Sequence, residues 1–235
     1  FDFSKDPIEA YIDGEWVTAK GTTLGADNGI GVAAAMAILA DKSVVHPPLE
    51  VLITVDEETG MYGAFALEGG VLQGKYLLNL DSEAEGELYV GCAGGVDTTA
   101  KFAYTPVEVE EGDVAVKVSV TGLKGGHSGC DIHLQRANAN KLLFRFLKEA
   151  VANYEARLAS VEGGSLRNAI PREASAIITV PAEGVEDIMD LVAECEDLFI
   201  AEYDGVEDNI HLAAEEVSCP TTELPEDVQD FLIHA

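Results

Sequence analysis

Residues 25–41 read G-A-D-N-G-I-G-V-A-A-A-M-A-I-L-A-D, and this stretch decides the fold class of the first part of the chain. A glycine-rich loop leads into an alanine-rich run that is apolar on every side. A helix without a polar stripe is a buried helix, so we expect residues 29–41 to pack into a sheet. The apolar runs 49–55 and 75–80 have the length of central strands in a mostly parallel sheet. Strands that alternate with a helix in this way predict an α/β fold.

The pattern changes near residue 95. Residues 114–120 (V-A-V-K-V-S-V) alternate between apolar and other residues with a period of two, which predicts a strand with one buried face. A helix is expected from about 137 to 159, a strand at 174–180 and a second helix at 185–203. These elements predict a compact α+β unit over residues 95–216, after a first domain at 1–94. Residues 217–235 open a further element, so we expect the chain to be a piece of a larger fold.

Composition excludes several classes of partner. The chain has 235 residues, of which 47% are apolar, and its 43 Asp and Glu against 14 Lys and Arg give a net charge of −29. Such a chain repels nucleic acid and anionic lipid. Its longest apolar stretches are shorter than the roughly 20 residues that span a bilayer. We therefore expect no nucleic-acid and no membrane partner. The acidity has two explanations, a salt-adapted surface or carboxylates gathered to hold cations.

The cysteines and the N-terminus indicate a cytoplasmic protein. Cys92, Cys130, Cys195 and Cys219 form no C-x-x-C pair and no dense framework. We expect them to be reduced, buried thiols. The first residues show no basic segment, apolar run or cleavage site of an export signal.

Three acidic clusters follow the predicted strands or precede the predicted helix. They contain Asp27, the pair Glu57 and Glu58, and Asp81, which stands in N-L-D-S-E at 79–83. The carboxyl ends of strands form the edge at which open α/β sheets bind ligands. Carboxylates brought together raise one another's pKa unless a cation neutralises them. The sequence therefore predicts a metal site, although each cluster alone is also explained as a helix N-cap or a solvated loop.

The Glu57-Glu58 pair suits a site with two metal ions. Two ions about 3.5–4 Å apart can share one carboxylate and activate a water, while an unbound carboxylate handles the proton. One of two adjacent residues can bind metal while the other faces the water.

The histidines offer no obvious metal ligand, although zinc prefers some imidazole. His46 precedes a predicted strand and is expected in a loop. His127 lies in a glycine-rich loop, where it either meets a ligand or is merely solvated. His133 is expected to orient the following helix. His211 and His234 carry no motif.

Several motifs occur in order from about Phe1 to Val180. They are G-T-T-L-G-A-D-N-G-I-G, D-E-E-T-G-M-Y-G-A, N-L-D-S-E with G-C-A-G-G, G-L-K-G-G-H-S-G-C-D-I-H, R-A-N-A-N-K and S-L-R-N-A-I-P-R-E-A. Together they resemble the bacterial aminoacyl-histidine dipeptidases, also called Xaa-His dipeptidases or carnosinases. This family belongs to the co-catalytic zinc aminopeptidase and aminoacylase group.

The resemblance implies a set of roles in the first part of the chain. Asp27 would bridge two Zn²⁺ ions, Glu58 would bind one and Asp81 the other. Glu57 would be the general base and acid that acts on a metal-bridging water. Co²⁺ or Mn²⁺ could replace zinc.

In the second part, the resemblance implies that His127 stabilises the oxyanion, often in the partner subunit's active site, and that Asn168 contacts the substrate. An Arg frequent about 13 residues further on is replaced by Pro181. The family also supplies one imidazole per zinc, from an upstream H-x-D motif and a distant downstream histidine. These 235 residues contain neither, so the isolated chain is expected to be inactive.

The implied architecture is part of a mostly parallel-sheet α/β metallopeptidase catalytic domain with an inserted α+β lid or dimerisation domain. Residues 217–235 would begin the returning catalytic segment, and the lid would join a homodimer. The implied function is a cytoplasmic, metal-dependent dipeptidase for small dipeptides, with Xaa-His dipeptides such as carnosine as the class. The alternatives are a non-catalytic scaffold or dimerisation fragment, and an aminoacylase or tripeptidase of the same group.

Overall fold

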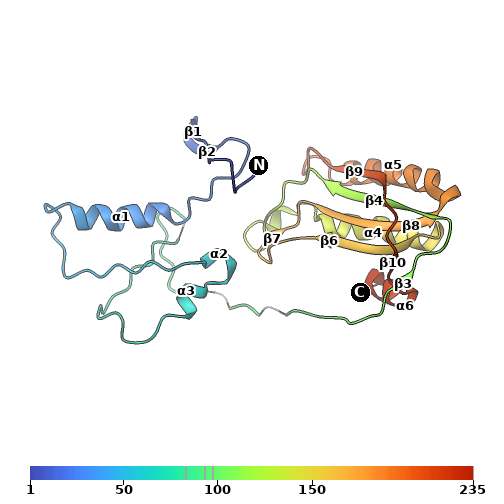
Figure 1. The fold of residues 1–235 in the computed structure, drawn as a ribbon. Helices are drawn as coiled ribbons and strands as arrows, with labels where there is room; N and C mark the ends of the chain where they lie inside the picture. Colours follow the sequence, from blue (N-terminus) through green and yellow to red (C-terminus); the bar gives the residue numbers. More distant parts are fainter. Residues whose placement is uncertain (83, 93, 97, 235) are drawn as a thin grey trace. The chain divides into compact units, whose positions relative to one another are not determined.

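The computed structural model describes residues 1–82, 84–92, 94–96 and 98–234, which fall into two compact units, 1–97 and 98–235 (Figure 1). Glu83 of N-L-D-S-E and Ala93 of G-C-A-G-G lie outside the described residues. Within the described ranges, no helix combines the length and apolar composition that crossing a bilayer requires.

The first unit contains a hairpin and three helices. The hairpin strands are antiparallel, and Gly14 supplies a positive φ at the turn between them. The predicted helix is present, because Asn28 caps its first turn by accepting a hydrogen bond from the N–H of Gly31. The elements are β1 (Ala10–Asp13), β2 (Trp16–Ala19), α1 (Gly29–Ala40), α2 (Glu57–Gly60) and α3 (Tyr62–Phe65).

The predicted strands at 49–55 and 75–80 are not formed. Both runs are irregular, and side chains such as Ile53 and Leu78 are exposed. A strand exists only as a member of a hydrogen-bonded ladder, and the only ladder among the described residues of this unit joins β1 to β2. The expected parallel sheet is therefore absent from the described residues, and α1 has only Gly31 buried instead of packing into a sheet.

The second unit is the predicted α+β structure. Its antiparallel sheet has the strand order β6-β8-β4-β9 (Figure 1). Two helices lie on the face of the sheet that carries Val116, Val118 and Val120. These elements are β4 (Asp113–Thr121), α4 (Ala139–Asn153), β6 (Arg157–Gly163), β8 (Ala174–Pro181), α5 (Val185–Glu202) and β9 (His211–Val217).

One predicted boundary is wrong, and two strands of the sheet, β6 and β9, were not predicted. The helix expected to reach residue 159 ends at Asn153, and Glu155 follows with a φ of 53° that no α-helix accepts. Residues 157–163 form β6 instead, because their backbone completes a ladder with β8. The second unpredicted strand is β9, which pairs with β4.

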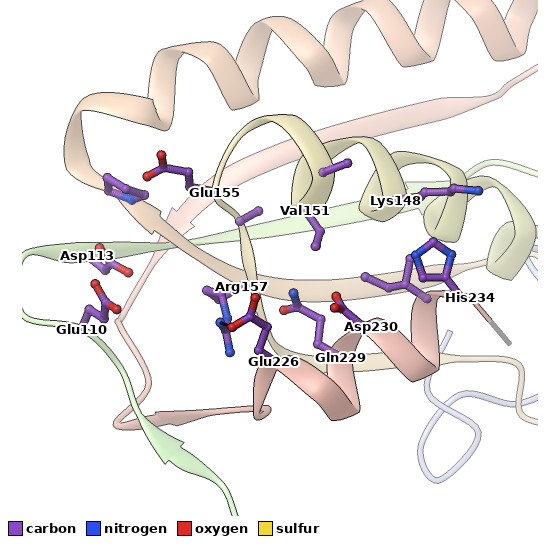
Figure 2. Close-up of a pocket in the computed structure, with 14 residues that line it drawn as sticks. Glu110, Asp113, Lys148, Val151, Glu155, Arg157, Glu226, Gln229, Asp230 and His234 are labelled. Carbon is purple, nitrogen blue, oxygen red and sulfur yellow. Dashed lines mark ion pairs between the residues drawn. The ribbon is translucent and has the colours of Figure 1, made fainter.

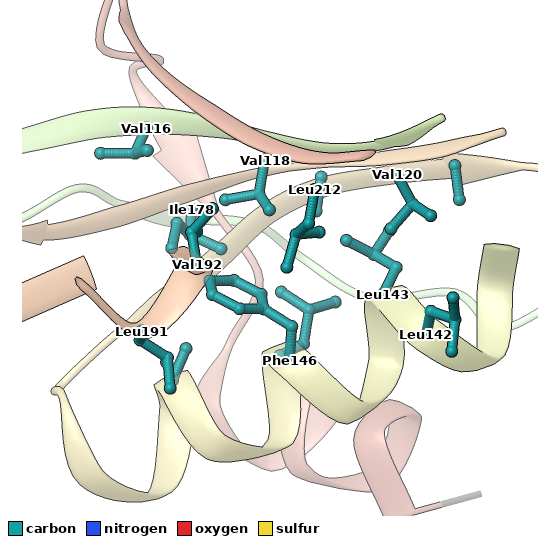
Figure 3. Close-up of a cluster of buried hydrophobic side chains, with 14 of the residues drawn as sticks. Val116, Val118, Val120, Leu142, Leu143, Phe146, Ile178, Leu191, Val192 and Leu212 are labelled. Carbon is teal, nitrogen blue, oxygen red and sulfur yellow. The ribbon is translucent and has the colours of Figure 1, made fainter. Parts of the chain in front are cut away.

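Helix α4 builds the core of this unit. Its buried side chains recur at three- and four-residue spacing, which makes one apolar stripe. Figure 3 shows Leu143 and Phe146 pointing from α4 toward the sheet, where Val118 and Val120 point back at them. All four side chains have no exposed surface. The second unit therefore has a continuous core of its own.

The C-terminal segment lies in the second unit. Strand β10 (Thr222–Glu223) pairs with β3 (Val107–Glu108), and α6 (Glu226–His234) contacts α4 and β6. The buried Gln229 accepts a hydrogen bond of 2.6 Å from the N–H of Leu158 through its side-chain oxygen. The assignment of residues 217–235 to a returning catalytic segment stays a prediction.

Short elements complete the second unit. They are β5 (Gly126–His127), the 3-10 turn η1 (Ile132–Leu134), β7 (Ala169–Ile170) and the 3-10 turn η2 (Ala182–Gly184). The four cysteines are free thiols. The expectation that they are buried is wrong for Cys92, Cys130 and Cys219, which are exposed, whereas burial raises the pKa of the Cys195 thiol.

We expect Phe146→Ala to destabilise the second unit by about 3–5 kcal/mol, because it leaves a cavity between α4 and the sheet. Leu198→Ala is the matched control on α5, since Leu198 is 54% exposed, and should cost less than about 1 kcal/mol. Urea unfolding followed by circular dichroism measures both. Equal losses in the two variants would contradict the core described above.

Candidate active site

The predicted acidic residues stand at the ends of irregular segments in the first unit. Glu57 and Glu58 form the first turn of α2, directly after the 49–55 run. Asp27 precedes the N-cap of α1, and Asp81 follows the 75–80 run. All four are exposed.

Asn28 joins two of these segments. Its side-chain Oδ1 caps α1, while its Nδ2 donates a hydrogen bond of 2.8 Å to the carbonyl of Leu80. One amide therefore fastens the residue after Asp27 to the residue before Asp81. The N-cap interpretation of the first acidic motif is confirmed for Asn28.

Two glycines of the motifs allow close packing at this place. A Cβ on Gly31 would lie 2.6 Å from Nδ2 of Asn28, so a larger residue would push the cap away. A Cβ on Gly63 would lie 2.6 Å from the backbone nitrogen of Val55, whose carbonyl accepts from the N–H of Gly63. Glycine at these positions keeps α1 and the α2–α3 turn in place.

The charges of the four acids act on one another. The pKa of Glu57 is raised above its ordinary value, first by partial desolvation of its carboxyl group and then by repulsion from Glu58, Asp81 and Asp27. The structure thus brings the four sequence-predicted carboxylates near enough to interact. Glu57 is the member that all the others act on.

A divalent cation fits this group in charge and in chemistry. Carboxylate oxygens are hard donors that bind Mg²⁺, Mn²⁺ and Zn²⁺, and a cation would relieve the repulsion at Glu57. Among the described residues, however, no three His, Cys, Asp or Glu side chains lie close enough to hold an ion as they stand. The ligand roles of Asp27, Glu58 and Asp81 therefore stay predictions.

His127 lies in the second unit, with its ring orientation fixed by backbone groups. The N–H groups of Gly129 and Cys130 both donate to its Nδ1 at 3.0 Å, and its own N–H donates to Asp131. Because Nδ1 is the acceptor, the neutral ring carries its proton on Nε2. The residue is exposed, so this Nε2–H can donate to a group outside the loop.

Asn168 lies next to this loop. Strand β5 pairs with β7, which sets His127 opposite Ala169, and the N–H of Ser128 donates to the backbone oxygen of Asn168 at 2.7 Å. The structure therefore brings together the two residues that were predicted in the second unit. Asn168 is half-buried, and its contact with a substrate stays a prediction.

Three other histidines lie outside the groups of predicted site residues. His46 lies in a loop, as predicted, with Nδ1 2.7 Å from the carbonyl oxygen of Pro47. His133 lies in η1, ahead of α4. His211 stands on β9, with Nδ1 3.5 Å from a carboxylate oxygen of Glu196.

Sequence reasoning missed three residues that hold the His127 loop. Asp131 accepts from the N–H of His127, Arg136 donates to the carbonyl of Gly125 at 2.7 Å, and Glu207 accepts from two backbone N–H groups. Asp131 and Arg136 stand in the quoted motifs and could have been found there. Glu207 is more than sixty residues away, and no local pattern marks it.

Two cavities lie in the second unit. One of about 470 Å³ is lined by side chains of α4, α6 and the start of β4, among them Lys148, Arg157, Glu226 and Asp230 (Figure 2). The other, of about 770 Å³, lies on the sheet face that carries Lys117 and Ser119 and reaches the 163–175 segment. Neither is lined by His127 or Asn168.

Comparison with known proteins defines the class. Residues 118–207 match the M20 family model described as a peptidase dimerisation domain. The matching part of the second unit is similar to the dimerisation domain of M20 peptidases, and the α/β fold class with a dimerisation domain is confirmed.

The relatives are bacterial dipeptidases. The chain is 52% identical over 217 residues to the cytosol non-specific dipeptidase of Escherichia coli, covering 92% of this chain and 45% of that protein. It matches the crystal structure of the aminoacylhistidine dipeptidase of Vibrio alginolyticus at 46% identity with a TM-score of 0.61, over 100% of this chain and 48% of that one. The resemblance to bacterial Xaa-His dipeptidases is confirmed, and the chain spans about half the length of these relatives.

A more distant relative matches half of the chain. The uncharacterized protein YqjE of Bacillus subtilis is 32% identical over 121 residues, which cover 48% of this chain and 33% of that protein.

We expect Asp81→Asn to lower the pKa of Glu57, because it removes one of the negative charges that repel the ionised carboxylate. A carbon-13 NMR titration of the Glu57 carboxyl group measures this. Since the raised pKa favours protonated Glu57 in the folded state, its stabilising contribution is present below the ordinary pKa and is lost as pH rises through the folded one. Glu50→Gln is the control, since Glu50 instead accepts from the N–H groups of Gln73 and Gly74. If Glu50→Gln shifted the pKa of Glu57 more than Asp81→Asn does, the interaction between Glu57 and Asp81 would be contradicted.

Proposed function

We propose that this chain is part of a metal-dependent dipeptidase that hydrolyses small dipeptides, with Xaa-His dipeptides among its substrates. The observation that carries the proposal is the group of four carboxylates around Glu57, whose pKa is raised by burial and by the other three. The E. coli relative is named as a non-specific dipeptidase and the Vibrio relative as an aminoacylhistidine dipeptidase, which supports both the reaction and the substrate class.

The four acidic residues have two different roles in this proposal, metal binding and proton transfer. Asp27, Glu58 and Asp81 would hold two metal ions, which we propose to be zinc, with Co²⁺ or Mn²⁺ as substitutes. When bound, the ions supply Lewis acidity toward the scissile carbonyl and make a water more acidic. Glu57 takes a proton from the attacking water and delivers it to the leaving amine.

His127 donates a hydrogen bond to the oxyanion in this proposal. Two backbone N–H groups occupy Nδ1, so the Nε2–H is the donor available to a substrate. A donor fixed in advance stabilises developing charge without reorganisation. Asn168, joined to the loop by the hydrogen bond from the N–H of Ser128, would contact the same substrate.

We further propose that the protein is cytoplasmic and forms a homodimer through the second unit. The name of the E. coli relative supports the location, and the family model supports the dimerisation. The sheet has two edge strands, β6 and β9, and we propose β9 as the dimer edge. The N–H of Leu212 donates to Glu196 and not to β4, so the backbone groups of Ala214, two residues further, also face away from β4. A second copy of β9 would pair with this edge.

We expect Ala214→Pro to shift the intact protein from dimer to monomer, because proline removes the outward N–H that the second copy would pair with. Sedimentation velocity measures the change. Ala214→Ser keeps the N–H and should remain dimeric. A dimeric proline variant with unchanged circular dichroism would exclude this edge.

We expect Glu57→Ala to remove turnover by at least about 10²-fold while leaving the metal content unchanged, since Glu57 is not a ligand in this proposal. The variant is tested in a protein that contains this sequence together with the imidazole ligands that the resemblance implies. Dipeptide hydrolysis and elemental analysis of the purified protein measure the two effects.

Asp81→Asn is the matched ligand variant and should lose metal and turnover together. Retained activity in Glu57→Ala would overturn the role of Glu57. An unaltered intact protein with neither stoichiometric metal nor hydrolysis would favour the non-catalytic scaffold.

A further inference from the structure

We infer that Glu207 is a positioning residue for His127: its buried carboxylate ties together the two ends of the loop that presents the imidazole. The inference rests on the proposed function, in which His127 meets the substrate. Glu207 follows α5 and is only 8% exposed.

The two carboxylate oxygens of Glu207 accept hydrogen bonds from the two ends of the loop. Oε2 accepts from the N–H of Lys124 at 2.8 Å, and Oε1 accepts from the N–H of Ala137 at 3.0 Å. Lys124 stands where the loop leaves β4, and Ala137 stands where it enters α4. A single side chain therefore closes the loop that contains His127.

A carboxylate is required for this closure. Burying a charge is costly unless hydrogen bonds compensate it, and both of these bonds are strengthened by the charge. Ala137 precedes the N-cap Asn138, so the positive end of the α4 dipole also favours a negative group here. An amide in place of the carboxylate keeps one acceptor and turns a donor toward the other N–H.

Hydrogen bonds and an ion pair of neighbouring residues connect the two ends of the loop to the imidazole. Arg136, next to Ala137, donates to the carbonyl of Gly125, next to Lys124, at 2.7 Å. The same guanidinium lies 3.6 Å from Asp131, which accepts from the N–H of His127 at 2.9 Å. The ends of the loop, its middle and the histidine are thus joined in one network.

The segment that carries Glu207 is seated against the loop on both sides. The Lys124 ammonium donates to the carbonyl of Val206 at 2.6 Å and lies 2.8 Å from a carboxylate oxygen of Asp208. A Cβ on Gly122 would lie 1.8 Å from the carbonyl oxygen of Asn209, so only glycine allows this approach. The position of Glu207 is therefore fixed by its neighbours.

The test compares Glu207→Gln with Asp208→Asn in the 235-residue chain. Asp208 is an exposed carboxylate on the same segment and beside the same lysine, so its variant is the matched control. Nitrogen-15 NMR of the His127 ring at mildly alkaline pH reports the tautomer, and hydrogen exchange reports the N–H groups of Gly129 and Cys130. In Glu207→Gln we expect a mixture of tautomers and at least about tenfold faster exchange at these two amides. Exchange at Phe146 in α4 should be unchanged, and Asp208→Asn should match the parent chain.

The kinetic arm uses an intact protein that contains this sequence. Glu207→Gln should lower kcat at least about tenfold with KM changed less than about threefold, because a misplaced oxyanion donor weakens the transition state. An unchanged His127 tautomer and unchanged exchange in Glu207→Gln would overturn the inference and leave the proposed function standing. If Glu207→Gln unfolds the second unit, Glu207→Asp, which is too short to reach both N–H groups, replaces it in the same measurements. A different result would overturn the role of His127 instead. In that case Glu207→Gln exchanges faster at the N–H of Gly129, but His127→Gln keeps full activity.

Discussion

Carboxylates that lie near one another are the feature of the first unit on which the proposed metal site depends. Partial desolvation and the charges of Glu58, Asp81 and Asp27 raise the pKa of Glu57, and a cation would relieve this repulsion. The side chain of Asn28 bonds both α1 and Leu80, so it keeps the segments of Asp27 and Asp81 together. In the proposed dipeptidase these carboxylates serve to bind metal.

The two units differ in how much of their apolar sequence they bury. In the second unit, the apolar stripe of α4 meets the valines of β4, and the core has no exposed member among Leu143, Phe146 and Val118. In the first unit, α1 is apolar on every side but has only Gly31 buried, and runs such as 75–80 find no ladder. The chain spans about half the length of its dipeptidase relatives.

The second unit also shows how a loop can be held without regular structure. The His127 loop carries several glycines, and its order comes from side chains that bond its backbone. Asp131 and Arg136 do this from within the loop, and Glu207 does so from outside it. Each bond fixes a backbone group that would otherwise be free to rotate. The imidazole therefore receives its orientation from charged residues, although none of them need touch a substrate.

The sequence by itself determined the elements that short-range pattern controls. The period of two in 114–120 predicted β4, the helices expected at about 137–159 and at 185–203 correspond to α4 and α5, and the acid motifs and G-G-H-S-G loop predicted the candidate residues. Tertiary structure alone decided the strands β6 and β9, because each forms a ladder with a strand from another part of the chain. It also decided that 49–55 and 75–80 stay irregular, and that Glu207 reaches the loop of His127. Local sequence fixes which face of an element is apolar and which side chains are charged, whereas long-range hydrogen bonds depend on what the folded chain places beside them.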